Sequence, residues 1–402
     1  MRPYVSIANK FMSFFFGGYS LADVIVIGGG IAGCTTAFYL AADGVDVTLL
    51  EQYELNTLAS GANAGSLHAQ IQTEPFVELG ESWARDYSPV LRFYEESIAL
   101  WREAGTVLGV DLEVDQGGGL LVAANDTQMR VIESKMKLER AAGLEVELLA
   151  AQDLRDKAPY ISERMIGAVF YPSEGKANPL VAAPAFAAAA ESLGAKIFQA
   201  CEVLAIGRGE AGYQVETSKG VFTAPRLINA AGVGAGRIAA MVGVEIEVQS
   251  FPIQLGVTEP IAPLIGHLVY SAGKMLTLKQ TKSGSVLIGG GWPAKLDKHH
   301  RAQVSRESLF GNLGVALKVV PELASASIVR TWVGQVNGNK SWRPMIGEMP
   351  GVPGFFVNYV PWMGFTGGPV GGRIIASLAQ GREPPVGFDA TQFEPSRSRP
   401  DF

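Results

Sequence analysis

The sequence has few of the residues that build disulfide-rich or metal-binding proteins. Only two of its 402 residues are cysteine and four are histidine. Cys34 and Cys201 are too few for a disulfide framework and form no CxxC metal motif. The four histidines lie in no HExxH motif and in no Cys/His ligand spacing; they are His68, His267, His299 and His300. We therefore expect no metal site.

Long apolar runs and an excess of basic charge are also missing. No stretch reaches the roughly 18 apolar residues that a membrane span needs. The 33 basic residues are outnumbered by 39 acidic ones, whereas nucleic-acid-binding proteins usually carry a basic patch. We expect a cytoplasmic protein with no membrane span and no nucleic-acid partner.

The first 19 residues are expected to be an extension before the first strand. The apolar run around Phe14–Phe16 is short, and no small-residue cleavage site follows it, so the segment differs from a secretory signal. Contact with a partner, or peripheral attachment to the inner membrane, is the alternative.

Glycine, in contrast, is abundant. It makes up 48 of the 402 residues, or about 12%, against an average near 7%. It shows no three-residue period, which excludes a collagen-like chain. Because hydrophobic residues reach 48%, the chain can form a sizeable core. The glycine excess then indicates places where the backbone turns tightly or approaches a ligand closely.

A glycine motif near the N-terminus predicts a dinucleotide-binding unit. Residues 22–27 are a β-rich apolar run, typical of a parallel strand buried on both faces. Gly28, Gly30 and Gly33 follow in the spacing GxGxxG and lead into a helical stretch. These glycines allow a tight turn, close approach of the backbone to a pyrophosphate, and close helix–strand packing.

The next strand, predicted over 45–50, ends at Glu51. An acidic side chain at this place can accept hydrogen bonds from both ribose hydroxyls, and it disfavours the 2′-phosphate of NADP. The order of strand, glycine motif, helix, strand and acid predicts a Rossmann-like α/β fold. It does not distinguish NAD from FAD.

Two further segments favour FAD. Residues 60–68 are mostly small and show neither helical nor strand period, so their backbone N–H groups can line a flat ligand. Near the C-terminus, a strand predicted over 355–359 is followed by Gly364 and Gly367 at the start of a helix that runs to about Gln380. The N-terminus of that helix can stabilise the negative charge that a flavin gains on reduction.

Together these segments resemble the FAD-dependent amine and amino-acid oxidoreductases of the D-amino-acid oxidase superfamily, which includes glycine oxidase, sarcosine oxidase and D-amino-acid dehydrogenase. The resemblance covers almost the whole chain from about residue 20. It is carried by 28–33, Glu51, 60–65, Asn178-Pro179, 229–232 and 364–369. A narrower resemblance, to the FAD subunits of opine oxidase and hydrogen cyanide synthase, is carried by 63–68, 276–280, 289–293 and 330–332.

The resemblance implies a discontinuous FAD-binding domain with a substrate domain inserted into it. The FAD-binding domain is expected to comprise 20–80, 155–235 and 330–395. The sheet-rich α+β substrate domain is expected to comprise 81–154 and 236–329, where short β-like runs occur.

The same resemblance implies which residues hold the FAD. We expect no covalent bond to it, because Cys34 and Cys201 are interpreted as small core residues. Glu51 is expected to bind ribose, Val203 to contact adenine through its backbone, and 230–232 to approach the pyrophosphate. The full set expected to contact FAD is Gly28, Gly30, Ile31, Ala32, Gly33, Glu51, Gln52, Ser60, Asn63, Ala64, Gly65, Ser66, Leu67, Val203, Ala230, Ala231, Gly232, Gly364, Phe365, Thr366 and Gly367.

The sequence departs from the family at the substrate-binding arginine. Relatives that bind small amino acids read Gly-Leu-Arg-Pro here, and the arginine clamps the substrate carboxylate. In this chain Val336 occupies that position. Arg343 is either a replacement for it or a structural surface arginine. His68, beside the flavin loop, and Trp362 are the other candidate catalytic residues, and Lys279 is a further candidate.

We therefore expect an FAD-dependent oxidoreductase that oxidises a C–N bond by hydride transfer to flavin N5. An opine-like N-substituted amino acid is the first choice of substrate, and a D-amino acid or glycine the second. Two alternatives remain: a flavin subunit that passes electrons to companion subunits or a quinone, and a flavin-binding protein that has lost catalysis.

Overall fold

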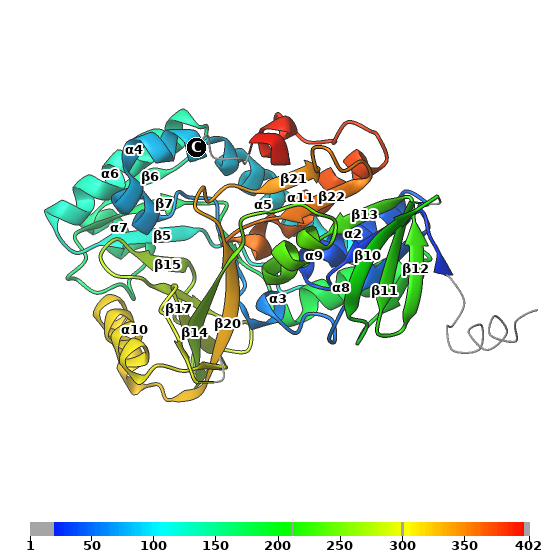
Figure 1. The fold of residues 1–402 in the computed structure, drawn as a ribbon. Coiled ribbons are helices and arrows are strands. Elements are labelled where there is room, and N and C mark those ends of the chain that lie inside the picture. The colour runs from blue at the N-terminus through cyan, green and yellow to red at the C-terminus, as the bar shows by residue number, and fades with distance from the viewer. Residues whose placement is uncertain (1–19, 211, 299–300, 398–402) are drawn as a thin grey trace, which may run out of the picture.

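The computed structural model describes residues 20–210, 212–298 and 301–397. The expectation for residues 1–19 lies outside this range. Within it the chain forms a mixed α/β fold in which helices pack on several sheets (Figure 1). The α/β class predicted from the sequence is thereby confirmed. No helix in the described part of the chain is both long enough and apolar enough to span a bilayer.

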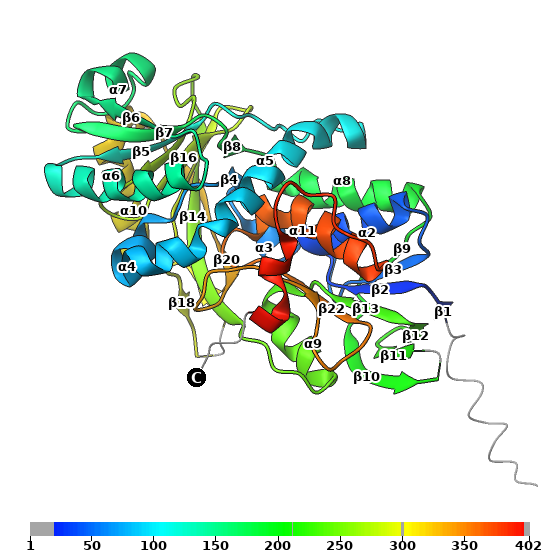
Figure 2. The same ribbon diagram turned by 90° about the horizontal axis from the view of Figure 1, so that it is seen from above.

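A six-stranded sheet supports the glycine motif. Its order is β21-β22-β13-β2-β3-β9, and all neighbours are parallel except β21 and β22. The strands are β2 (Val24–Ile27), β3 (Val47–Leu50), β9 (Lys196–Phe198), β13 (Arg226–Asn229), β21 (Met345–Glu348) and β22 (Phe355–Tyr359). Three helices lie together on one face of it (Figure 2), α2 (Ile31–Ala42), α8 (Pro179–Ser192) and α11 (Gly364–Ala379).

The turn from β2 to α2 depends on two glycines. Gly28 has a φ of +113°, a conformation that a side chain disfavours. A Cβ placed on Gly33 would lie 1.8 Å from the carbonyl oxygen of Gly28, so only glycine allows the helix to pack this close to the strand end. The predicted motif thus has a steric reason.

A smaller sheet covers the other face. It has the order β1-β12-β11-β10 and contributes Val215 and Phe222 to an apolar cluster with Ile25 and Ile27 of β2. Its strands are β1 (Ser20–Leu21), β10 (Val203–Gly209), β11 (Gly212–Thr217) and β12 (Gly220–Ala224). The short helix α9 (Ala235–Met241) packs beside it, after the 3-10 turn η2 (Gly232–Gly234).

An eight-stranded sheet forms the second half of the molecule (Figure 1). Its order is β20-β14-β17-β16-β15-β5-β7-β6, and only the β5–β15 pair is parallel. The strands are β5 (Gly119–Ala123), β6 (Glu147–Ala150), β7 (Gly167–Tyr171), β14 (Gln249–Pro260), β15 (Leu268–Ser271), β16 (Thr277–Gln280), β17 (Ser285–Gly289) and β20 (Ile328–Gly338).

The remaining elements surround these sheets. The helices are α4 (Thr73–Tyr87), α5 (Pro89–Leu108), α6 (Asp126–Ala141), α7 (Ala151–Lys157) and α10 (Arg306–Val319). The 3-10 turns are η3 (Pro321–Ser325), η4 (Ala390–Phe393) and η5 (Pro395–Arg397), and a short hairpin joins β18 (Lys295–Leu296) to β19 (Ala302–Gln303).

The eight-stranded sheet bears on the predicted domain boundaries. The sheet contains β7 and β20. The predicted division, however, assigns β7 and most of β20 to the FAD-binding domain. Boundaries placed after each of these strands would keep the sheet whole. The division into two domains stays a proposal.

The run 60–68 is more regular than its composition indicates. Residues Ala59–Ala62 form the short helix α3, and Ser66–Leu67 form β4, which pairs with β8 (Gly175–Lys176). The Asn63 side chain ends the helical turn by donating to the carbonyl oxygens of Ala59 and Ser60. The prediction of an irregular run was wrong here, because this local capping and the pairing with a strand more than 100 residues away have no periodic signal.

Candidate active site

One large cavity lies where the two halves meet. Its volume is about 790 Å³, within the ~300–1,000 Å³ that ligand pockets occupy. It opens at the carboxyl ends of β2, β3 and β13, where ligands bind in open α/β sheets. The residues that follow these strands, Gly28, Glu51 and Ala230, all line it.

The N-termini of two helices border this cavity. Gly30 and Ile31 at the start of α2 line it, as do Gly364 and Phe365 at the start of α11. Helix N-termini carry unpaired N–H groups and a partial positive charge. The cavity can therefore stabilise negative charge at both places.

The Glu51 carboxylate lies at the same end of the sheet. Its Oε2 accepts from the backbone N–H of Gly29 at 2.6 Å, and its Oε1 accepts from that of Tyr53 at 2.8 Å. Each oxygen keeps a second acceptor position. Val203 and Arg237 line the cavity nearby, and Arg237 donates to the Val203 carbonyl oxygen at 3.1 Å.

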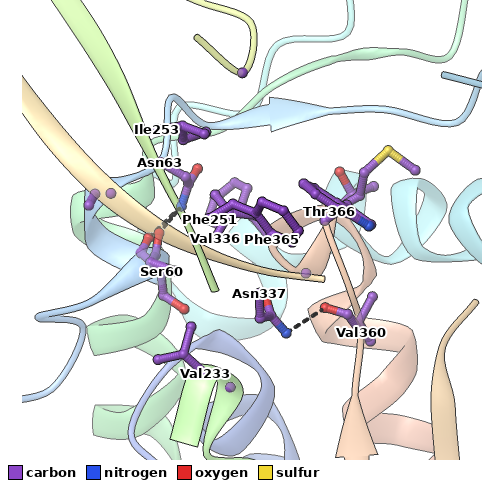
Figure 3. A pocket seen from close by; sticks show the side chains of 18 of the residues that line it. Ser60, Asn63, Val233, Phe251, Ile253, Val336, Asn337, Val360, Phe365 and Thr366 are labelled. Atoms are coloured by element: carbon purple, nitrogen blue, oxygen red, sulfur yellow. Dashed lines mark hydrogen bonds between the residues drawn. The ribbon is translucent and has the colours of Figure 1, made fainter. Parts of the chain in front are cut away.

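The α3 segment forms a second wall. The Ser60 hydroxyl accepts from the N–H of Ile31 at 2.9 Å, which ties α3 to the start of α2. Ser60 and Asn63 face Phe251, Ile253 and Val336 across the cavity (Figure 3). These three come from β14 and β20, so both halves of the molecule contribute to the site.

Most residues predicted to contact FAD border this one cavity. Those that line it are Gly28, Gly30, Ile31, Ala32, Glu51, Gln52, Ser60, Asn63, Ala64, Ser66, Val203, Ala230, Ala231, Gly232, Gly364, Phe365 and Thr366. Four others do not line it, and they are Gly33, Gly65, Leu67 and Gly367. A Cβ at Gly65 or Gly367 would clash with the Ala177 carbonyl oxygen or the Phe93 ring, at 2.1 and 2.7 Å, so these two glycines allow packing behind the wall.

Two of the three predicted catalytic residues also border the cavity. His68 and Trp362 line it, whereas Arg343 does not. The Arg343 guanidinium donates to the backbone carbonyl oxygens of Asp86 and Gln392. It therefore connects the end of α4 to the C-terminal turn η4. This contact agrees with the hypothesis that Arg343 is a structural arginine.

His68 has a defined partner. Its Nδ1 lies 2.6 Å from the Tyr270 hydroxyl, and its backbone N–H donates to Thr366 Oγ1 at 3.1 Å. Burial, and secondarily the Lys279 ammonium, lower the pKa of His68 to about 3. The imidazole is consequently neutral at physiological pH.

A buried carboxylate stands behind this pair. Glu174 is fully buried and accepts from the N–H groups of Ala69 and Gln70 at 2.7 and 2.9 Å, and from the Gln70 side chain at 2.9 Å. The pKa of Tyr270 is raised by burial and by the charge and hydrogen bond of Glu174. Glu174 is thus placed to receive the Tyr270 hydroxyl hydrogen.

A buried ion pair extends this network. Lys135 and Glu139 are both fully buried and lie 2.5 Å apart. The Lys135 ammonium also donates to Gln70 Oε1 at 3.3 Å. Since a buried charge is costly without a partner, the pairing accounts for a lysine on the cavity wall.

Lys279 lies one layer behind the cavity. It is fully buried and donates to the Ser66 hydroxyl. Burial, with repulsion from Lys176, lowers its pKa to about 7. Its side chain does not line the cavity.

Several lining residues had no motif to indicate them. Phe251 and Ile253 follow the period-two pattern of a strand, which could have marked their shared face. Tyr270 and Trp342 gave no such signal, because their positions depend on strand pairing and loop packing.

Comparison with known proteins identifies the family. A family model described as FAD dependent oxidoreductase matches residues 23–378. The chain belongs to this family. The predicted superfamily, the FAD cofactor and the oxidoreductase activity are thereby confirmed, while the narrower resemblance to opine oxidase and hydrogen cyanide synthase subunits stays a prediction.

Relatives in this FAD-dependent oxidoreductase family match along most of their length. Glycine oxidase of Geobacillus kaustophilus is 27% identical over 382 residues, which cover 93% of this chain and 97% of the relative. Sarcosine oxidase subunit beta of an Arthrobacter species is 26% identical, with 88% and 86% covered. The crystal structure of the Geobacillus glycine oxidase superposes with a TM-score of 0.81 at 26% identity, covering 95% and 100% of the two chains.

A similar fold occurs in L-proline dehydrogenase from P. horikoshii, with a TM-score of 0.83 at 23% identity, covering 94% of this chain and 98% of that one.

The residues of the cavity fit FAD. A Cβ added at Gly232 or Gly364 would meet no atom within 4 Å, so the backbone borders open space at both. The two helix N-termini offer donors for phosphate and flavin oxygens, and the Glu51 carboxylate offers acceptors for ribose hydroxyls.

Proposed function

We propose that this chain oxidises the C–N bond of an amino acid or a secondary amine. The observation that carries the proposal is the pairing of His68 with Tyr270, at 2.6 Å, on the wall of the FAD-binding cavity. Bound FAD supplies the oxidant, because flavin N5 accepts a hydride from the carbon that bears the nitrogen. The substrate C–H bond breaks, a C=N bond forms, and water hydrolyses that product to a carbonyl compound and an amine.

The hydrogen-bond order around His68 defines its role. Glu174 already accepts three N–H bonds and is an acceptor only. We infer that Tyr270, whose pKa is raised by burial and by the charge of Glu174, donates its hydroxyl hydrogen to the Glu174 carboxylate, and that it accepts from Nδ1–H of His68. This leaves Nε2 of His68 as an acceptor, since the described residues offer it no hydrogen-bond partner.

We infer that Nε2 accepts a hydrogen bond from the substrate nitrogen. Only a neutral amine can release a hydride from the adjacent carbon, because its lone pair forms the C=N bond. A neutral imidazole nitrogen can accept an N–H of the substrate, which an imidazolium cannot do, so the neutral state of His68 allows it to orient the amine at the flavin. Tyr270 and Glu174 act as positioning residues that fix the ring and its tautomer.

FAD is proposed to lie along the cavity with its adenosine end near Glu51 and Val203. The pyrophosphate would then lie beside the α2 N-terminus and 230–232, and the flavin between α3 and the start of α11. Non-covalent attachment remains part of this proposal. So do the two-domain division and a cytoplasmic location.

Companion subunits are a further part of the proposal. The Arthrobacter relative is named as subunit beta of sarcosine oxidase, so we propose that this chain assembles with companion subunits and passes electrons to one of them. In that case the reduced flavin of the isolated chain should reoxidise slowly in air.

The test is an anaerobic screen of amines and amino acids against the purified FAD-loaded protein. Bleaching of the flavin absorbance by at least one of them is expected, and rapid or slow reoxidation in air then distinguishes oxygen from another acceptor. Full FAD occupancy with no bleaching by any amine would contradict the proposal and favour a flavin-binding protein without catalysis.

A further inference from the structure

The wall of the cavity formed by β14 and β20 is mostly apolar. Its one polar residue among those the structure describes is Asn337, whose side-chain amide donates to the Val360 carbonyl oxygen at 3.2 Å. Phe251 pairs with Val336 and Ile253 with Gly334 in the antiparallel register, so alternate residues of both strands share one face. All four line the cavity, and Figure 3 shows the side chains of Phe251, Ile253 and Val336. Leu255, next on β14, lines it as well. Among the described residues of β14 and β20, none with a charged side chain lines the cavity; Arg330, which pairs with Val257 further along the same face, lies outside the lining. We call this part of the face the β14–β20 wall.

Aromatic rings extend this wall. Trp362 stacks between Phe251 and Trp342, with ring centroids 4.4 Å from the first and 4.3 Å from the second. The two indoles are within 13° of parallel. Trp83 supports the stack by meeting Trp342 edge-on at 6.2 Å. Phe251, Trp362 and Trp342 all line the cavity.

The two tryptophans hold unusual backbone conformations. Trp342 has a φ of +62° and Trp362 a φ of +60°, the left-handed region that bulky residues avoid. Such strain persists only where the surroundings enforce it, and it clusters at ligand sites. Here the Trp362 N–H donates to the Asn337 carbonyl oxygen at 2.8 Å, which fixes the ring beside β20.

The ring stack suits an apolar group better than a cation. A cation is attracted to an open aromatic face. Both faces of Trp362 are covered, by Phe251 and Trp342, so its ring has no open face for a cation. Ring edges and aliphatic side chains favour apolar or aromatic partners.

A carboxylate, in turn, has no arginine to bind here. The positively charged side chains that line the cavity in the described residues are Lys135, Arg237 and Lys274. Lys135 is paired with Glu139, and Arg237 contacts Val203 and Glu202 at the Glu51 end. Only Lys274, exposed on the loop after β15, is open to a substrate carboxylate. A carboxylate against the β14–β20 wall would lose water without gaining a partner.

We propose that the β14–β20 wall and the stacked rings of Trp362 and Trp342 bind an aromatic or branched apolar substituent of the substrate. The preferred substrates are then secondary amines with such a substituent, rather than small zwitterions such as glycine. This inference rests on the proposed function and names the substrate class of that same site.

The test separates the apolar substituent from the carboxylate. Four amines form a matched set: dimethylamine, N-methylbenzylamine, sarcosine and N-benzylglycine. Each is mixed anaerobically with the FAD-loaded protein, and flavin reduction is followed against concentration. We expect the two benzyl compounds to have ratios of reduction rate to Kd higher by about tenfold or more, since buried apolar groups discriminate on that scale. Removing the carboxylate should change the ratio less.

Variants assign the preference to the rings. Trp342→Ala should remove most of the benzyl preference, Trp342→Phe should retain much of it, and Lys274→Met should leave it in place. Equal ratios for benzyl and methyl compounds in the natural protein would overturn the inference. So would a benzyl preference that survives in a folded Trp342→Ala protein, or a loss of reduction confined to carboxylate substrates in Lys274→Met.

A binding measurement keeps this inference separate from the proposed function. Methoxyacetate and benzyloxyacetate carry oxygen in place of nitrogen, so they bind without forming a C=N bond. Tighter binding of benzyloxyacetate, measured by the change in flavin absorbance, supports the inference even where no amine reduces the flavin. Equal affinity for the two ethers overturns the inference, even where amines reduce the flavin.

Discussion

Glu51 Oε2 accepts the backbone N–H of Gly29 at 2.6 Å, which joins the end of β3 to the glycine turn after β2. Replacing Glu51 with Gln keeps the size of the side chain but removes its charge. A charged hydrogen bond is worth ~1.5–3 kcal/mol, so we expect Glu51→Gln to weaken FAD binding by about tenfold or more. Titration of the apoprotein with FAD, followed by fluorescence quenching, measures this.

The matched control is Glu54→Gln, on an exposed residue three positions away. It should leave the Kd for FAD unchanged. Equal affinities in both variants and the natural protein would mean that Glu51 does not bind the cofactor.

Replacing Tyr270 with Phe should slow flavin reduction, because His68 would lose the partner of its Nδ1. The net worth of such a hydrogen bond, about 0.5–1.5 kcal/mol, corresponds to a reduction rate about two- to tenfold lower. His68→Asn should slow reduction at least as much. Stopped-flow measurement of the reduction rate and Kd checks both.

A structural role alone would give a different result. If Tyr270→Phe lowered the melting temperature but left the reduction rate unchanged, the positioning role would be wrong. In the natural protein the pH profile of reduction should follow the pKa of each amine used, because His68 stays neutral above a pKa of about 3.

The lowered pKa of His68 also predicts how stability depends on pH. Unfolded histidine titrates near 6.5, whereas His68 in the fold titrates near 3. Between these values the unfolded state binds a proton that the folded state does not, so the free energy of unfolding falls as the pH falls from 6.5 towards 3. The slope from His68 is at most ~1.4 kcal/mol per pH unit, the value for one proton that only the unfolded state binds.

Urea denaturation at pH 4, 5, 6 and 7 measures this slope. The His68→Asn variant should lose stability less steeply over the same range, since other groups titrate identically in both proteins. Parallel curves would contradict the assignment.

Replacing Arg343 with Met should reduce stability without weakening substrate binding. The guanidinium satisfies two backbone carbonyl oxygens, of Asp86 and Gln392, and losing such bonds costs ~1–3 kcal/mol. Thermal denaturation and the Kd for N-benzylglycine give the two readouts. Arg130→Met, on an exposed residue of α6, serves as the surface control.

The opposite pattern would support the hypothesis that Arg343 replaces the substrate-binding arginine of the family. A weaker Kd confined to substrates with a carboxylate, at unchanged melting temperature, would mean that Arg343 binds the substrate.

FAD should be released completely by acid. Both cysteines are buried, and Cys34 Sγ is engaged with the Gly29 carbonyl oxygen at 3.5 Å. Precipitation with trichloroacetic acid should therefore leave all flavin absorbance in the supernatant. A yellow pellet would demonstrate a covalent bond and contradict non-covalent attachment.

The strand–helix–strand unit around the glycine motif could be predicted from the sequence because its signals are local. Gly28, Gly33 and Glu51 lie within one strand–helix–strand unit, where glycine spacing and an acidic strand end have direct steric and electrostatic meaning. The helix over 364–379 could be predicted for the same reason, because the glycines at its start follow directly after a predicted strand.

The cavity wall opposite that unit could not be predicted from the sequence because it depends on distant pairing. Phe251 and Val336 are neighbours only through the register of β14 with β20. The His68–Tyr270 contact joins residues 202 positions apart. Neither contact follows from the spacing of residues along a single segment, so composition and periodicity could not indicate them.

The strand order of the six-stranded sheet also constrains when the protein can become functional. β2, near the N-terminus, pairs with β13, and β13 pairs with β22, which ends at Tyr359. During synthesis the N-terminal strands must wait for most of the chain before this sheet is complete, and domains built from such distant pairings fold slowly. FAD is therefore expected to be captured only after translation, and a nascent chain stopped before β22 should emerge without cofactor.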